Sequence, residues 1–224
     1  MPRWKPPKQG SKASSDTLQQ KVHPMSDKVS LQNNAGSHRN AALPQYERSP
    51  HDLYTTPADP VQRLYKSRPW LAQTIVWDSS AGLGHIVKAV RDCGGEAIGT
   101  ELTDHPFSKL VDDIEMGVDF LALEQPRASH LVINPPYNAA DRHIAHGLKL
   151  GCTVFAIMRV NFICAKKRAF LLPYLREILM VGRTHMPPPG AVDQGQSPSI
   201  DYAWFRFEPE KKDAGDHGIR LERI

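Results

Sequence analysis

The chain has 224 residues, of which 40% are hydrophobic and 23% are charged, and its formal net charge is +4 at pH 7. This length suits one globular domain with an unfolded extension and leaves little room for two full domains. No stretch approaches the roughly 18 consecutive apolar residues of a membrane span. The basic N-terminus is followed by no apolar segment of a secretory signal. We therefore expect a cytoplasmic protein with no membrane partner.

Residues 1–48 carry much of the positive charge, with eight Lys or Arg against three Asp or Glu. The segment is rich in Ser, Gln, Asn and Pro and has no sustained apolar period, which predicts a disordered basic tail. Such a tail adds salt-sensitive attraction to phosphates, independent of sequence. A solubilising extension without a partner is an equal alternative.

From about residue 49 onward, short apolar runs alternate with segments whose apolar residues lie three or four positions apart. The first pattern predicts strands and the second predicts helices. The predicted helices cover residues 61–71, 85–95, 140–151 and 166–177. The predicted strands cover residues 74–78, 96–102, 131–134, 153–160, 177–183 and 201–208. The stretch between residues 102 and 131 is ambiguous and is predicted to be mostly helical.

This alternation predicts an α/β fold, with a mostly parallel sheet and helices on both faces. The last two predicted strands lie close together in the sequence and are expected to pair antiparallel at one edge. In open sheets of this kind, ligands bind beyond the carboxyl ends of the strands. The unusual stretches of this sequence all follow predicted strands, so we expect them to meet in one crevice.

The cysteines are Cys93, Cys152 and Cys164. They share no C-x-x-C spacing and lie in segments that look like core, so we expect reduced, buried thiols in a cytosolic protein. The histidines show no ligand spacing either. The sequence therefore predicts no metal site.

The first stretch of the expected crevice is WDSSAGLGH, residues 77–85. Gly82 and Gly84 allow a tight turn and a close approach of the backbone to a ligand, and the helix that follows favours a ligand oxygen at its N-terminus. The stretch is not a full dinucleotide fingerprint, because Val87 stands where a third glycine is expected. Glu101 ends the next strand about 20 residues later, where an acid can accept hydrogen bonds from ribose hydroxyls.

The second stretch is Asn134, Pro135, Pro136 and Tyr137, which follows the apolar strand 131–134. Pro135 has no N–H and a fixed φ, so a central strand cannot continue through it. Pro136 stiffens the break because the residue before a proline is pushed toward extended conformations. The result is a rigid kink that holds an amide and an aromatic ring at the rim of the crevice.

Further stretches accompany this kink in a fixed order: DLYTTP (52–57), WDSSAGLG (77–84), VDF (118–120), RVNFICAKKRAFL (159–171) and DYAWFRF (201–207). This set resembles S-adenosylmethionine-dependent methyltransferases, specifically the N6-adenine DNA methyltransferases of the small phage and prophage type. The resemblance covers about residues 48–208. It implies a Rossmann-like methyltransferase fold over residues 49–224, with a mostly parallel seven-stranded sheet and an antiparallel edge strand.

The resemblance also implies the roles of particular residues. The implied cofactor-binding residues are Tyr54, Thr55, Thr56, Pro57, Asp78, Gly82, Gly84, Glu101, Asp119, Phe120 and Asn134. Thr56 and Pro57 would lie near the carboxylate of S-adenosylmethionine. Asp119 would hold its adenine amino group and Phe120 would stack on its adenine ring.

The implied catalytic residues are Asn134, Pro135, Pro136 and Tyr137. The N6 amine of adenine is a poor nucleophile, because its lone pair is delocalised into the ring. The Asn134 side-chain oxygen and the Pro135 carbonyl would accept hydrogen bonds from the two N–H groups and orient the nitrogen toward the methyl group. In duplex DNA the target base must be flipped out, and Tyr137 would stack on it.

Other substrates and a second class of function stay open. Methyltransferases that act on adenine in RNA, or on glutamine in proteins, use the same acceptors. The D-x-Y-x-T-P opening and the D-Y-A-W-F ending favour DNA, and the glutamine enzymes usually carry an extra helical domain. Ser79 and Leu83 depart from the family pattern, which leaves open a catalytically inactive nucleic-acid-binding relative. Arg142, Lys166, Lys167 and Arg168 are candidate phosphate contacts, and the loop 184–199 is a candidate lid or recognition loop.

Overall fold

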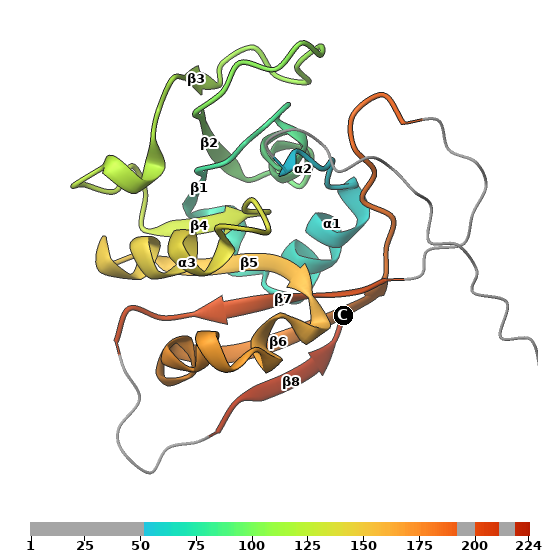
Figure 1. The fold of residues 1–224 in the computed structure, drawn as a ribbon. Coiled ribbons are helices and arrows are strands. Elements are labelled where there is room, and N and C mark those ends of the chain that lie inside the picture. Colours follow the sequence, from blue (N-terminus) through green and yellow to red (C-terminus); the bar gives the residue numbers. More distant parts are fainter. Residues whose placement is uncertain (1–51, 192–199, 211–217) are drawn as a thin grey trace, which may run out of the picture. The chain divides into compact units, whose positions relative to one another are not determined.

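The structure is a computed structural model that describes residues 52–191, 200–210 and 218–224 (Figure 1). The predicted basic tail, residues 1–48, lies outside the described residues. The predicted recognition loop, residues 184–199, is described as far as residue 191.

The described residues form the elements that are labelled in Figure 1. The α-helices are α1 (Ala58–Ser67), α2 (His85–Asp92) and α3 (Ala140–Lys149). The 3-10 helices are η2 (Pro69–Gln73), η3 (Phe120–Ala122), η4 (Val160–Cys164) and η5 (Lys166–Tyr174). The strands are β1 (Ile75–Asp78), β2 (Glu96–Glu101), β3 (Glu115–Met116), β4 (His130–Ile133), β5 (Thr153–Arg159), β6 (Leu175–Arg183), β7 (Asp201–Phe207) and β8 (Arg220–Arg223).

The strands form one eight-stranded sheet in the order β3-β2-β1-β4-β5-β7-β6-β8. The strands from β3 to β5 are parallel, whereas β7 runs antiparallel to both β5 and β6. The mostly parallel α/β sheet and the antiparallel pairing of β6 with β7 are as predicted. Two details of the prediction were wrong: the antiparallel strand β7 lies inside the sheet, between β5 and β6, and the sheet has eight strands instead of seven, because β8 pairs parallel to β6 at the edge. The chain thus has a Rossmann-like α/β fold.

Two hydrophobic cores cover the two faces of the sheet, and β4 shows how alternate residues divide between them. Val132 packs in one core with residues of α1 and α2, while Leu131 and Ile133 pack in the other with residues of α3. Figure 1 shows α3 alongside β4 and β5. The strand is therefore buried on both sides, which explains its unbroken apolar sequence.

Close packing of α3 on the sheet depends on Gly147. A Cβ atom built there would lie 2.5 Å from a methyl group of Leu131 and 2.9 Å from one of Val154. These distances are far below van der Waals contact, so a side chain at this position would push the helix away from β4 and β5.

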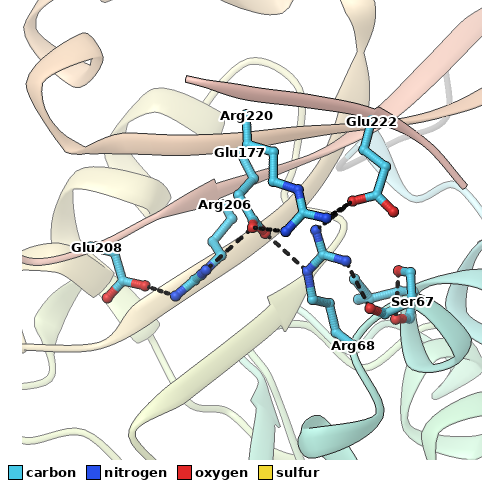
Figure 2. Close-up of polar contacts among 8 residues, drawn as sticks. Ser67, Arg68, Glu177, Arg206, Glu208, Arg220 and Glu222 are labelled. Carbon is cyan, nitrogen blue, oxygen red and sulfur yellow. Dashed lines mark hydrogen bonds and ion pairs between the residues drawn. The ribbon is translucent and has the colours of Figure 1, made fainter. Parts of the chain in front are cut away.

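A network of charged side chains connects the residue that follows α1 with β6 and with the edge strand β8 (Figure 2). Arg68, which follows α1, is 6% exposed and donates to Glu177 of β6 at 3.1 Å and to Glu222 of β8 at 2.9 Å. Its guanidinium also donates to the carbonyl of Ser67 at 2.7 Å. Arg220 of β8 reaches Glu222 at 2.9 Å. These contacts fix β8 beside β6.

Three predicted segments differ from the structure. The helix predicted for 61–71 is divided into α1 and η2, and Pro69 opens the second piece. The stretch between 102 and 131 holds β3 and η3 instead of an α-helix, and Gly117 within it has a φ of 76°. The helix predicted for 166–177 is the 3-10 helix η5, because Pro173 cannot donate an α-helical hydrogen bond.

The prediction of buried thiols holds for one cysteine only. Cys152 is buried, but Cys93 is half-buried and Cys164 is exposed, and all three are free. Cys164 is the last residue of the short 3-10 helix η4. In the described part of the chain, no helix is both long and apolar enough to cross a membrane.

Candidate functional site

A cavity of about 300 Å³ lies beyond the carboxyl ends of β1, β2 and β4. This is the position at which open α/β sheets bind ligands. Of the residues predicted from the sequence, ten line it: Tyr54, Thr55, Thr56, Asp78, Gly82, Glu101, Asp119, Phe120, Asn134 and Pro136. The strand ends therefore bring together side chains that are up to 82 positions apart, from Tyr54 to Pro136.

The glycine-containing turn between β1 and α2 forms one wall of this cavity. Gly82 and Gly84 both have left-handed backbones, with φ of 54° and 85°, which other residues adopt only with strain. A Cβ at Gly84 would lie 2.5 Å from a methyl group of Val111. Gly84 is also the residue before α2, and no side chain caps the helix there. The free N–H groups of this helix end therefore favour a ligand oxygen.

Glu101 organises the opposite wall through backbone N–H groups. One carboxylate oxygen accepts from the N–H of Gly82 at 2.8 Å, and the other accepts from Leu102 and Thr103 at 2.9 and 3.1 Å. Each carboxylate oxygen has further acceptor capacity, and the side chain lines the cavity. Glu101 is the residue that the sequence predicts to accept hydrogen bonds from ribose hydroxyls.

Asp78 is 2% exposed at the end of β1. Burial raises the pKa of its carboxyl to about 8, the charge of Glu101 adds to this, and the N–H of Ser80 opposes it. A buried carboxyl of this kind can pair with a cationic group in the cavity.

Two hydroxyls in the same turn lack partners. The Oγ atoms of Ser79 and Ser80 are buried and find no hydrogen-bond partner within the described part of the chain. Both residues line the cavity. Because buried polar groups are normally hydrogen-bonded, these hydroxyls indicate a polar ligand. Ser79, one of the two departures from the family pattern, thus adds a polar group to the site.

Asp119 and Phe120 line the cavity, but their neighbours restrict what they can do. The Asp119 carboxylate accepts from the N–H of Leu121 at 3.0 Å and so caps η3. The Phe120 ring is 2% exposed and packs against the rings of Trp77, His143 and His146 at 5.0–5.5 Å. Most of the Phe120 ring therefore serves the core.

The segment that precedes α1 joins the two sides of the site. The N–H and the hydroxyl of Thr55 both donate to the carbonyl of Pro187 at 2.9 Å. The hydroxyl of Thr56 accepts from the side-chain nitrogen of Asn134 at 3.0 Å. Pro57 lines a different cavity, of about 260 Å³, together with Thr55 and Pro187.

Asn134 and the prolines form the kink at the end of β4. The side-chain nitrogen of Asn134 donates to Thr56, so the side-chain oxygen is the atom left to accept from a ligand. Within the described residues the carbonyl of Pro135 accepts no hydrogen bond. The carbonyl of Pro136 accepts from the N–H of Ala139 at 2.9 Å and leads the chain into α3. Pro135 is buried and lines neither this cavity nor the second one described below, so the Asn134 side chain is the predicted acceptor that lies at the cavity wall.

A second cavity, of about 420 Å³, adjoins the first, since Asp52 and Tyr54 line both. It is also lined by Tyr137, Met158, Arg159, Asn161, Phe162 and Arg168. Asn134 and Pro136 line the first cavity and Tyr137 lines the second, so the kink forms the wall between them.

The Tyr137 ring is held firmly. Its hydroxyl is 3.1 Å from that of Tyr202, its ring centroid is 5.4 Å from that of Tyr54, and the guanidinium of Arg159 lies over the ring. Burial and the Tyr202 hydroxyl raise the pKa of Tyr137 above its usual value. The hydroxyl therefore stays protonated, and the ring can act as a stacking surface.

The structure reveals site residues that the sequence did not single out. Met186 lies 3.9 Å from both the Asn134 nitrogen and the Tyr137 hydroxyl. Tyr202 and Arg159 contact Tyr137, and Asn161 lines the second cavity. Arg159, Asn161 and Tyr202 lie in the stretches 159–171 and 201–207 that carry the resemblance, and Met186 lies in the candidate lid 184–199, but the sequence analysis gave none of them a role in the site.

The candidate phosphate contacts divide between the cavities and the surface. Arg142 lines the first cavity and Arg168 the second. Lys167 is exposed and lies 3.9 Å from Asp141, and Lys166 is exposed. Within residues 52–191, 200–210 and 218–224, no group of three or more His, Cys, Asp or Glu side chains is arranged to hold a metal ion.

Comparisons with known proteins agree on the fold. No protein-family model and no curated protein sequence matches the chain. Among solved structures, a protein of Pyrococcus horikoshii, described as a candidate RNA methyltransferase, has a TM-score of 0.55 and 19% sequence identity. The match covers 72% of this chain and 90% of that one. This likeness supports the Rossmann-like α/β fold.

A second similar structure is the methyltransferase subunit of a type I restriction-modification system from Streptococcus thermophilus. It has a TM-score of 0.47 and 12% identity, and the match covers 76% of this chain. This chain spans only about half of that subunit, since 47% of the subunit is covered.

Proposed function

We propose that residues 49–224 form one S-adenosylmethionine-dependent methyltransferase domain that methylates the N6 amine of adenine in DNA. The observation that carries the proposal is the hydrogen bond from the Asn134 side-chain nitrogen to Thr56. It leaves the amide oxygen as the acceptor at the wall between two adjoining cavities. The methyltransferase fold and the resemblance of the N-P-P-Y segment support this assignment.

The first cavity fits S-adenosylmethionine, which supplies the methyl group as a sulfonium when bound. Glu101 accepts from the ribose hydroxyls, and the buried Asp78 carboxyl faces a cationic group. The unpartnered hydroxyls of Ser79 and Ser80 satisfy polar atoms of the methionine part. Asp119 and Phe120 would meet the adenine part of the cofactor.

The second cavity fits the flipped adenine, and Tyr137 stacks on its ring with a contribution of about 1–3 kcal/mol. Asn134 and the Pro135 carbonyl accept from the two N–H groups, so the nitrogen lone pair is directed away from them. Because an amide oxygen is not a strong base, these acceptors act by orientation and by stabilising the more positive amine of the transition state. The bond between N6 and the methyl group forms as the sulfur–methyl bond of S-adenosylmethionine breaks, which leaves S-adenosylhomocysteine, and the positive amine then releases one proton to water.

The test is transfer of a labelled methyl group from S-adenosylmethionine to DNA, RNA and protein offered separately. We expect label in DNA, recovered as N6-methyladenine after digestion. RNA belongs in the assay because the Pyrococcus horikoshii protein is described as a candidate RNA methyltransferase. Label in RNA alone or in protein would overturn the DNA assignment. Cofactor binding without transfer to any polymer would indicate the inactive nucleic-acid-binding relative.

Asn134→Ala tests the chemical step in the same assay. We expect cofactor affinity within a few-fold of the unchanged protein, and a loss of turnover of about 10²–10³, as for removal of one group that stabilises a transition state. An unchanged turnover would remove Asn134 from the mechanism. We also expect a short recognition sequence, measured by sequencing methylated genomic DNA.

A further inference from the structure

The amide group of Asn134 can adopt two orientations, and the proposed reaction requires one of them. Its oxygen accepts hydrogen bonds and its nitrogen donates them, yet the two atoms are nearly equal in size and exchange places on a half-turn of the side chain. In the wrong orientation, the amide would point N–H groups at the N–H groups of the target amine. The proposed reaction therefore requires contacts that stabilise one orientation of the amide over the other.

Two acceptors meet the amide nitrogen. The Thr56 hydroxyl lies 3.0 Å from it and the Met186 sulfur 3.9 Å. Both side chains are buried, with exposed fractions of 3% and 7%. An amide nitrogen carries two N–H groups, so the site offers one acceptor for each.

The two acceptors act differently. A hydroxyl can donate as well as accept, so Thr56 anchors the amide in either orientation. A thioether sulfur has no hydrogen to donate. A reversed amide would bring its oxygen against Met186, and two acceptors would then face each other. Met186 is thus the group that excludes the wrong orientation.

Met186 contacts both ends of the kink, since its sulfur lies near the side chains of Asn134 and Tyr137. The Tyr137 hydroxyl lies 3.9 Å from the same sulfur and 3.1 Å from the Tyr202 hydroxyl. The next residue, Pro187, is tied to Thr55 by two hydrogen bonds of 2.9 Å. The segments that carry Thr56 and Met186 are therefore fixed to each other on either side of Asn134.

We infer that Thr56 and Met186 are positioning residues that hold the Asn134 amide with its oxygen toward the target amine. Thr56 holds the amide in place, and Met186 determines its orientation. This inference rests on the proposed function. It concerns residues that do not touch the reacting atoms and act through Asn134.

The matched variants are Met186→Leu, which keeps an apolar side chain of similar volume, and Thr56→Val, which keeps the branched shape. We expect kcat to fall about three- to fivefold for Met186→Leu, since the lost acceptor is weak. We expect a fall of about tenfold for Thr56→Val, which loses one hydrogen bond. The KM for DNA should stay within about twofold in both, and Thr56→Ser should restore kcat.

A second pair of variants distinguishes a loss of amide orientation from a general disturbance of the packing around the site. A carboxylate has two equivalent oxygens and cannot be reversed. In the Asn134→Asp background, Met186→Leu should therefore leave kcat within a factor of about 1.5, because coupled residues show non-additive effects. An equal loss in both backgrounds would overturn the role of Met186.

A readout without turnover keeps this inference distinct from the proposed function. In protein labelled with ¹⁵N, the side-chain N–H signals of Asn134 are identified by their loss in Asn134→Asp. We expect slow exchange of these hydrogens with water in the unchanged protein and faster exchange in Thr56→Val and Met186→Leu. Equal exchange rates would overturn the inference even if DNA is methylated. If no polymer is methylated, protected hydrogens would still support the positioning contacts.

Discussion

The guanidinium of Arg159 lies over the ring of Tyr137, 5.3 Å from its centroid. Such a contact is a cation–π interaction. Both residues line the second cavity, and Arg159, at the end of β5, is exposed. The ring that we propose for stacking the target base thus has a cation on one face. A base that stacks on this face displaces the guanidinium, which is then free to approach the phosphates beside the flipped nucleotide.

We therefore expect Arg159→Met to weaken DNA binding about three- to tenfold at low salt and to lower the slope of log affinity against log salt by about one. The affinity for S-adenosylmethionine should not change. Titration of a labelled duplex at several salt concentrations measures both quantities. Arg220→Met is the matched control, because it removes the same charge from β8, at the far edge of the sheet. An equal change of slope in both variants would count against a local phosphate contact.

Cofactor affinity should depend on the ionisation of Asp78. Since burial raises the pKa of this carboxyl to about 8, it is mostly neutral at pH 6.5 and mostly ionised at pH 9. The cationic cofactor favours the ionised form, so we expect affinity to rise with pH by up to about tenfold per unit below pH 8 and then to level off. Calorimetric titration at several pH values measures this.

Asp78→Asn should remove the pH dependence and bind more weakly at pH 8.5. His85 lines the same cavity. Burial lowers the pKa of His85, so its charge is lost below the range in which Asp78 ionises. His85→Gln should therefore keep the rise in affinity up to pH 8. A rise that survives in Asp78→Asn would assign it to another group.

The glycine-containing turn allows a strain test with an internal control. Gly84 and Gly94 have similar left-handed backbones, with φ of 85° and 79°. An added Cβ meets Val111 at 2.5 Å in the first case and nothing within 4 Å in the second. We expect Gly94→Ala to cost about 1–2 kcal/mol of unfolding free energy and to leave cofactor affinity unchanged. Gly84→Ala should cost more unfolding free energy and should also weaken cofactor binding. Urea unfolding measures the first quantity and calorimetric titration the second.

The buried ion pairs of Arg68 predict a large stability effect far from the site. Arg68→Met leaves Glu177 buried without its nearest cation, and breaking such a pair costs about 3–5 kcal/mol. Lys88→Met removes an exposed pair with Asp92 on α2, which is worth about 0.3–0.5 kcal/mol. Urea unfolding of both variants gives the comparison. A similar, small loss in the two variants would show that water or Arg206, 3.6 Å from Glu177, replaces the lost contact.

The sequence predicted the site best where chain-local rules decide the structure. Pro135 and Pro136 cannot continue β4, so the kink and its acceptors follow from two residues. Gly82 and Gly84 predicted the turn before α2 for the same reason. The parallel sheet then brought these strand ends together, as the alternation of strands and helices requires.

The sequence predicted the site least well where distant segments meet. Met186 is 52 positions from Asn134, and Tyr202 is 65 positions from Tyr137. Nothing near Met186 distinguishes it from a core methionine. Phe120 shows the reverse case, since rings supplied by α3 and β1 bury most of a side chain that looked free to stack. The sequence also failed to predict β3 and β8, because both are short strands with few apolar residues.

The packing of Gly147 has a consequence for genetics. Its missing side chain lets α3 rest on Leu131 of β4, three residues before Asn134, which directly follows this strand. A survey of inactivating mutations should therefore score Gly147 as strongly as the residues that meet the substrate, although it lines neither cavity. If a second mutation that shortens the side chain of Leu131 restored activity, the defect of the Gly147 variant would be the spacing between α3 and β4.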